Sequence, residues 1–236
     1  MSILILALES SGQSGSISTA EGPRLVAELS LDREQRSARS LAPGIRELVK
    51  SAGWEMADIE LVAVVVGPGS FTGLRVGVAT AKTLAYALGA RCVGLNTLEV
   101  IAAQCSSELS QLWIAMDAQR GQVFAARYER VEADWQMVAA PTVMDNDHWL
   151  QSLGPGIAVS GPALVKLAKH VSARVTIVAA DDWEPRAATV AALAWRRHLA
   201  GAYDDLWRLA PLYLRKSAAE EKLEQKGEGR GSRIAD

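Results

Sequence analysis

Few residues in this chain are placed to do chemistry on their own. The three histidines, His148, His170 and His198, do not form the short-spaced pair that a zinc or iron site usually needs. Ser14 and Ser70 lack the G-x-S-x-G frame of a nucleophile elbow, and no histidine lies near either serine in the sequence. We therefore predict no catalytic residue and no metal site. A catalytic set whose side chains lie far apart in the sequence stays an open alternative.

A glycine-rich segment is the feature that could hold a phosphate group. Residues 67–73 read GPGSFTG, between an apolar run and a run of small residues. The amides at a helix N-terminus bind anions readily. However, a Walker A loop needs a lysine directly after its last glycine, where this chain has Leu74, and the dinucleotide pattern needs a different glycine spacing. We interpret the segment as a structural turn first and as a phosphate loop second.

This segment needs a strand before it and a helix after it. Residues 61–66 are apolar and mostly β-branched, which is typical of a strand covered on both faces of its sheet. In residues 70–88 the only formal charges are Arg75 and Lys82, and Gly89 suits a left-handed C-terminal cap. The apolar surface of this helix is wider than the single stripe that covering a sheet requires.

A ridge of small residues runs along the predicted helix. Gly73, Gly77, Ala81 and Ala85 recur at every fourth position and lack bulk, so another backbone can approach closely. One interpretation is that the chain's own sheet and a neighbouring helix bury both faces. The other is that the ridge contacts another subunit.

The rest of the chain alternates strands with helices and then restarts. The order of strand, acid, glycine turn and strand seen around Glu9 returns around Asp117. We predict an α/β protein with two lobes, each with a mixed central sheet flanked by helices. The predicted limits are residues 1–108 for the N-terminal lobe, 109–216 for the C-terminal lobe, and 217–236 for a mobile charged tail. Strands are expected near residues 3–8, 17, 25–29, 92–95, 113–116, 123–128, 157–160 and 175–178, and further helices over 40–52, 97–105, 162–171 and 185–199.

Composition narrows the function classes. The chain has 236 residues, of which 49% are hydrophobic and 22% charged, as in ordinary globular proteins. Its net charge of -2 argues against a broad nucleic-acid-binding face, so any contact with nucleic acid is expected only through a partner. Cys92 and Cys105 suit reduced core positions, and no apolar run approaches the length of a membrane span. We expect a cytoplasmic protein that does not contact membranes.

Several segments carry a resemblance to a known family. They are GPGSFTGLRVGVATAKTLA at residues 67–85, ILALESS at the N-terminus, NTLEVIAAQ, AMDAQRGQVFAARY, and PLYLR at residues 211–215. Through them most of the chain resembles the TsaB family, formerly called YeaZ, of bacterial partner proteins in the formation of threonylcarbamoyladenosine in tRNA. The resemblance implies a duplicated actin-like fold of the ASKHA type.

The resemblance also implies a role and a surface. The role is that of a noncatalytic partner that stabilises and activates TsaD, together with the ATPase TsaE, for tRNAs that read codons beginning with A. In relatives, the helices equivalent to residues 40–52 and 70–88 contact TsaD, and the same surface supports a homodimer. The chain is expected to have no cofactor of its own, its cofactor-binding residues are unknown, and ATP or ADP is allowed at the partner interface. The implied interface residues are Leu41, Ile45, Leu48, Phe71, Gly73, Leu74, Gly77, Val78 and Ala81.

Two other functions compete with this one. The glycine segment and the internal duplication also suit an actin-like small-molecule kinase or ATPase, although the known phosphate-binding sequence motifs are missing. A serine peptidase ranks third, because relatives were once labelled glycoproteases. Steady ATP turnover or peptide cleavage by the isolated chain would favour these alternatives.

Overall fold

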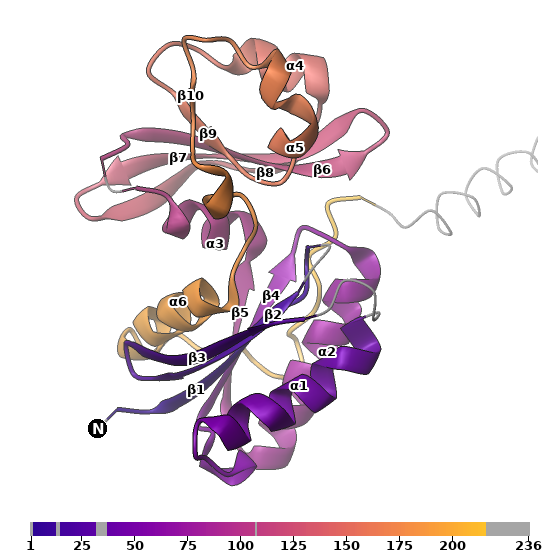
Figure 1. Ribbon diagram of the computed structural model, residues 1–236, viewed down its shortest axis with the longest axis vertical. Helices are drawn as coiled ribbons and strands as arrows, with labels where there is room; N and C mark the ends of the chain where they lie inside the picture. Colours follow the sequence, from indigo (N-terminus) through magenta and orange to yellow (C-terminus); the bar gives the residue numbers. More distant parts are fainter. Residues whose placement is uncertain (1, 13–14, 32–36, 107, 216–236) are drawn as a thin grey trace, which may run out of the picture.

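The protein is built from two stacked lobes. The computed structural model describes residues 2–12, 15–31, 37–106 and 108–215, with only the backbone described for residues 37–39. Each lobe has a five-stranded sheet flanked by helices (Figure 1). The predicted α/β class with two mixed sheets is confirmed. Ser14 and the tail predicted over residues 217–236 lie outside the described residues.

The first sheet is organised around its central strand, β1 (Leu4–Glu9). This strand pairs antiparallel with β2 (Ser16–Glu21) and parallel with β4 (Leu61–Gly67). The outer strands are β3 (Arg24–Ser30) and β5 (Arg91–Asn96), so the order is β3-β2-β1-β4-β5. The register places Leu8 beside both Ile17 and Val64, and all three side chains are buried.

The second sheet repeats this plan. Its central strand, β6 (Gln111–Gln119), pairs antiparallel with β7 (Gln122–Val131) and parallel with β9 (Ala158–Ser160). With β8 (Asp134–Asp145) and β10 (Thr176–Ile177) at the edges, the order is β10-β9-β6-β7-β8. Each sheet thus has the same connectivity about its central strand, which confirms the internal duplication predicted from Glu9 and Asp117.

Helices cover both faces of each sheet. On the first sheet, α1 (Ser37–Ser51) and α2 (Phe71–Leu88) pack on one face, and α6 (Ala187–Leu199) packs on the other. On the second sheet, α3 (Thr97–Gln104) covers one face. The short helices α4 (Asn146–Ser152) and α5 (Leu164–Leu167) cover the opposite face. Short 3-10 turns span Met56–Asp58, Ala168–His170 and Ala180–Asp182.

Two helices contact the lobes across the chain order. Helix α3 lies between the sheets, with Val100 packed on the first and Leu98 and Ile101 packed on the second. Helix α6 follows the second sheet, but its Val190 and Ala194 pack on the first. The boundary predicted at residue 108 follows the order of the sheets along the chain, whereas residues 187–199 pack with the first lobe, as Figure 1 shows for α6.

A C-terminal strap, defined here as residues 203–215, continues along the first lobe. Gly94 donates its backbone N–H to the Asp204 carboxylate (2.8 Å), and Asp204 donates its own to the carbonyl oxygen of Cys92 (2.9 Å). These bonds cover the outer edge of β5, which would otherwise present unpaired backbone groups. Leu209 anchors the strap in the core, where it is 8% exposed.

Both cysteines lie in the core, as the sequence predicts. Cys92 and Cys105 are both free and buried, and burial raises the pKa of each thiol to about 11. Within the described ranges, no helix combines the length and apolar character that crossing a membrane requires.

Candidate functional site

The glycine segment packs closely against Ser10 and Ser11, the residues that follow β1. Ser70 donates its backbone N–H to the carbonyl oxygen of Ser11 (2.8 Å), and the Ser10 hydroxyl donates to the carbonyl oxygen of Gly73 (2.9 Å). A Cβ atom at Gly73 would lie 2.0 Å from the Ser10 carbonyl oxygen, and one at Gly69 would lie 2.6 Å from that of Ser11. The glycines are needed because two backbones touch here.

This contact explains the segment without a phosphate. The side chain of Ser70 caps α2 by accepting the N–H of Gly73 (3.3 Å), and Gly89 ends the helix in the left-handed conformation with φ 65°. The residues that follow β1 lie against the first turn of the helix. The geometry favours the structural-turn interpretation over a phosphate loop.

The small-residue ridge faces the chain's own first turn. A Cβ atom at Gly77 would lie 2.1 Å from the Ser10 hydroxyl oxygen and 3.5 Å from Val64. Ala81 and Ala85 continue the ridge and are buried against the sheet. The prediction that Gly73 and Gly77 receive a partner helix is therefore wrong.

Most of the other predicted interface side chains are also internal. Phe71 is half-buried and reaches the surface. The remaining predicted side chains lie between the helices and the first sheet and are at most 5% exposed: Leu41, Ile45, Leu48, Leu74, Val78 and Ala81. These residues fix the two helices on the sheet, so a partner would meet the opposite side of the helices.

The outward side of α2 carries small uncharged side chains. We call it the α2 outer face, and its members are at least partly exposed: Thr72, Val76, Ala79, Thr80, Thr83 and Ala87. Sequence reasoning missed these residues, although they form a stripe with helical spacing in a segment with only two charges. The available signal was the absence of charge on the side away from Leu74 and Val78.

Both charged side chains of α2 turn aside to the strap. The guanidinium of Arg75 lies 3.9 Å from the ring centroid of Phe71 and donates to the Tyr213 hydroxyl (3.0 Å). The ammonium of Lys82 donates to the backbone carbonyl oxygens of Leu209 (2.9 Å) and Trp207 (3.4 Å). The strap thus holds the charges of α2 at one side of the outer face and leaves the face itself uncharged.

Glu9 lies fully buried where β1 ends. Its Oε1 accepts hydrogen bonds from the backbone N–H and from the hydroxyl of Ser11, both at 2.6 Å, whereas no hydrogen bond to its Oε2 is found among the described residues. Burial raises the pKa of Glu9 to about 7; the bonds from Ser11 oppose the rise, and the charge of Glu184 adds to it. A carboxyl group in this position is partly protonated at neutral pH.

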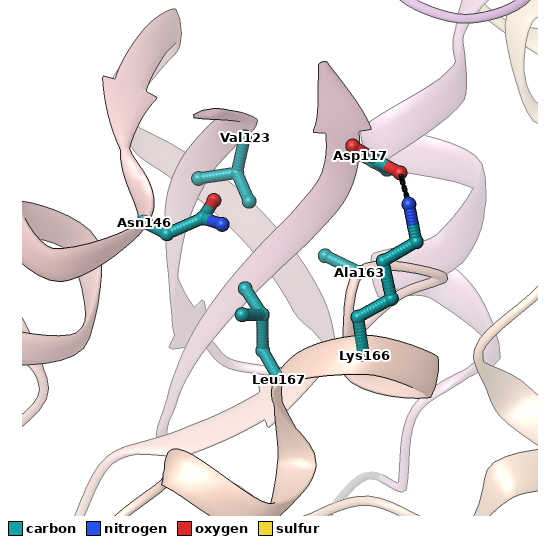
Figure 2. A pocket seen from close by; sticks show the side chains of 6 residues that line it. All are labelled: Asp117, Val123, Asn146, Ala163, Lys166 and Leu167. Atoms are coloured by element: carbon teal, nitrogen blue, oxygen red, sulfur yellow. Dashed lines mark hydrogen bonds and ion pairs between the residues drawn. The ribbon is translucent and has the colours of Figure 1, made fainter. Parts of the chain in front are cut away.

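Asp117 is the equivalent acid of the second lobe, and it is engaged by neighbouring groups. Its carboxylate lies 2.5 Å from the ammonium of Lys166 and accepts the N–H of Gln119 (2.7 Å). Figure 2 shows the pair beside a small pocket that Asn146 also lines. The pocket holds about 20 Å³, room for roughly one water molecule and far below the several hundred Å³ of typical small-molecule sites.

The other candidate residues stay dispersed. His148 lies on α4, His170 on the turn after α5, and His198 on α6, where its Nδ1 shares a 2.7 Å hydrogen bond with the Tyr203 hydroxyl. Across the described part of the chain, no three His, Cys, Asp or Glu side chains gather as metal ligands. Ser70 serves as a helix cap.

Comparison with known proteins agrees with this architecture. The family model described as "TsaD: tRNA N6-adenosine threonylcarbamoyltransferase" matches residues 32–183. The structure of YeaZ from Pseudomonas aeruginosa superposes with a TM-score of 0.76 at 20% identity, over 90% of this chain and all of that one. The two duplicated sheets define an α/β protein of the actin-like class.

Sequence relatives place the chain more narrowly. The "tRNA threonylcarbamoyladenosine biosynthesis protein TsaB" of Bacillus subtilis strain 168 is 27% identical over 229 residues, covering 92% of this chain and 96% of that protein. The Escherichia coli K12 protein of the same name is 27% identical over 234 residues, or 93% and 97% of the two chains. An uncharacterized Mycobacterium tuberculosis protein is 31% identical over 185 residues, or 78% and 77%. The chain belongs to the TsaB (YeaZ) family.

Proposed function

We propose that this chain is a noncatalytic partner that stabilises and activates TsaD in forming threonylcarbamoyladenosine in tRNAs that read codons beginning with A. Membership of the TsaB family supports this, because relatives that align over more than nine-tenths of their length are named as biosynthesis proteins of that modified nucleoside. The state of Glu9 supports a noncatalytic role, because its carboxyl group is fully buried and accepts two hydrogen bonds from Ser11.

The observation that carries the proposal is the α2 outer face. The solvent-facing side of a helix normally bears charged residues. On α2, however, Arg75 is bound to the Tyr213 hydroxyl and Lys82 to the backbone of the strap. Small exposed side chains such as Ala79 and Thr83 allow another helix to approach closely. Because this chain itself matches a TsaD family model, TsaD is built on a related plan and can present a helix of its own. The docking surface is therefore the α2 outer face, extended by the neighbouring exposed side of α1.

The remaining assignments follow from this role. In isolation the same face supports a homodimer, and TsaE and tRNA join through the complex with TsaD. The chain holds no nucleotide of its own, and ATP or ADP binds, if at all, at the partner interface. The protein works in the cytoplasm, away from membranes.

Reconstitution tests the function directly. tRNA modification is measured with TsaD, TsaE and the threonylcarbamoyl donor, with and without this chain, and ATP hydrolysis is measured on this chain alone. The proposal expects modification to depend on the chain and the isolated chain to turn over no ATP. Modification at the same rate without the chain would reject the partner role, and ATP turnover that copurifies with the chain and is lost in Glu9→Gln would favour the kinase or ATPase alternative.

A further inference from the structure

The end of the strap, residues 211–215, contacts the first lobe at three places. Leu212 donates its N–H to the carbonyl oxygen of Val66 at the end of β4 (2.7 Å). Its own carbonyl oxygen lies so near Gly67 that a Cβ atom there would be 2.6 Å away. Tyr213 stacks on Phe71 with 4.5 Å between ring centroids, at the first turn of α2.

The same five residues also reach the second lobe. The Arg215 guanidinium donates to the carbonyl oxygen of Ala118 (2.7 Å), at the end of β6. Ala118 is 5% exposed and sits between Asp117 and the hairpin turn in which Gln119, Arg120 and Gly121 all have positive φ. A charged donor on a nearly buried carbonyl oxygen is a stronger contact than an exposed ion pair.

This arrangement connects the first turn of α2 with the end of β6. The charge-free outer face of α2 depends on Arg75, which Tyr213 holds through its hydroxyl. Two residues later, Arg215 holds the strand end that carries Asp117. The contact of α6 with the second lobe lies elsewhere, where Arg196 pairs with Asp134 at the β7–β8 turn.

We propose that residues 211–215 form a latch that joins the first turn of α2 to the end of β6, so that binding at the α2 outer face is transmitted to the second lobe. Tyr213 and Arg215 act as positioning residues at its two ends. The latch itself is a property of the isolated chain, and only its response to TsaD rests on the proposed function.

Hydrogen–deuterium exchange of the full-length chain tests the latch. In Arg215→Ala, amides of residues 117–121 and of residues 73–78 should both exchange faster, by about tenfold if one charged hydrogen bond is lost. Arg215→Lys should recover most of the protection, since it keeps a donor. Arg208→Ala is the matched control, because Arg208 lies on the same strap with its side chain 89% exposed and pairs with the neighbouring Asp205.

The variant Tyr213→Phe distinguishes an effect that passes from Arg215 to α2 through the latch from a general loosening of the fold. It keeps the ring stack on Phe71 and removes only the hydroxyl that binds Arg75. In this background, Arg215→Ala should still speed exchange at residues 117–121 but no longer change exchange at 73–78. Faster exchange confined to 117–121 and the strap in the otherwise native chain would overturn the latch, as would the same increase in Arg208→Ala.

Amide exchange measured with saturating TsaD then tests how the latch responds to binding. Protection at residues 117–121 should rise on binding to the native chain and not on binding to Arg215→Ala. If TsaD does not bind the native chain at all, the proposed function fails, while the exchange of the isolated variants still decides the latch. Binding that protects α2 but leaves 117–121 unchanged in the native chain would overturn transmission.

Discussion

At the residue scale, Glu9 is an acid whose side chain is fully buried. Ser11 supplies two hydrogen bonds to one carboxylate oxygen, but burial outweighs them and raises the pKa to about 7. A raised pKa of an acid means that the folded state holds its proton more tightly than the unfolded state does. Folding therefore opposes ionisation of this residue.

This gives a signed prediction for pH. Below pH 4.5 Glu9 is protonated in both states, and stability should fall as pH rises from there to about 7, where the folded-state group ionises. Glu9→Gln removes this penalty, so the variant should be more stable than the native chain at pH 8, by about 3 kcal/mol at 1.4 kcal/mol per pKa unit. Urea unfolding at pH 4 and pH 8 measures the difference.

An exposed acid provides the control. Glu47→Gln on the solvent side of α1 should leave the native pH dependence unchanged. If Glu9→Gln unfolds at the same urea concentration as the native chain at both pH values, the buried carboxyl does not carry this penalty.

At the element scale, α2 is held by close backbone contact with Ser10. The clash at Gly77 involves the Ser10 hydroxyl, at 2.1 Å from a built Cβ, whereas that at Gly73 involves the Ser10 carbonyl oxygen, at 2.0 Å. A hydroxyl can be removed by mutation, but a carbonyl oxygen cannot. The two glycines can therefore be distinguished experimentally.

We expect Gly77→Ala to destabilise the native chain by about 1 to 3 kcal/mol through overpacking. In a Ser10→Ala background the same substitution should become neutral or stabilising, because alanine favours a helix over glycine by about 1 kcal/mol. Gly73→Ala should destabilise both backgrounds. Thermal melts of the six proteins give the double-mutant cycles, and a Gly77→Ala variant that melts higher than the native chain would contradict the contact.

Much of the element pattern could be predicted from the sequence, because strands such as 61–66 are continuous apolar runs and α2 has a cap at each end, Ser70 and Gly89. The strand β8 was missed, since it lies at an edge, is mostly exposed and contains Pro141, which an edge strand tolerates. The helix α4 that follows it was missed too. The orientation of the ridge could not be predicted, because periodicity gives the faces of a helix but not which face meets the chain's own β1–β2 turn.

At the scale of the whole molecule, the positions of α3 and α6 join the lobes. The face of the first sheet formed by Ile5, Ala7 and Ala63 is covered by α6, from the far end of the described chain. Chain order placed α6 in the second lobe, and local sequence carries no signal for such a crossing. Helix α3 contacts both sheets, the first through Val100 and the second through Leu98 and Ile101.

A fragment of residues 1–108 should therefore not fold alone. Without α6 it would expose an apolar sheet face, and without the second sheet α3 would lose the contacts of Leu98 and Ile101. We expect a poorly dispersed NMR spectrum and aggregation, and recovery of a folded complex when residues 109–236 are coexpressed. A well-dispersed, cooperatively unfolding fragment would show that these contacts are not needed for stability.

The central claim is that the α2 outer face binds TsaD, and the affinity of TsaD for one variant tests it most directly. Ala79 lies exposed in the middle of this face, and Ala79→Arg keeps a good helix former while adding bulk and charge. Ala192→Arg makes the same change at an exposed position of α6, on the opposite face of the sheet. Both variants should melt within a few degrees of the native chain, as surface substitutions usually do.

Isothermal titration of TsaD into the native chain and both variants then decides the claim. The account predicts that Ala79→Arg weakens binding by about 100-fold or more, the range of a disrupted interface centre, while Ala192→Arg binds like the native chain. A folded Ala79→Arg variant that binds TsaD with native affinity would contradict the account.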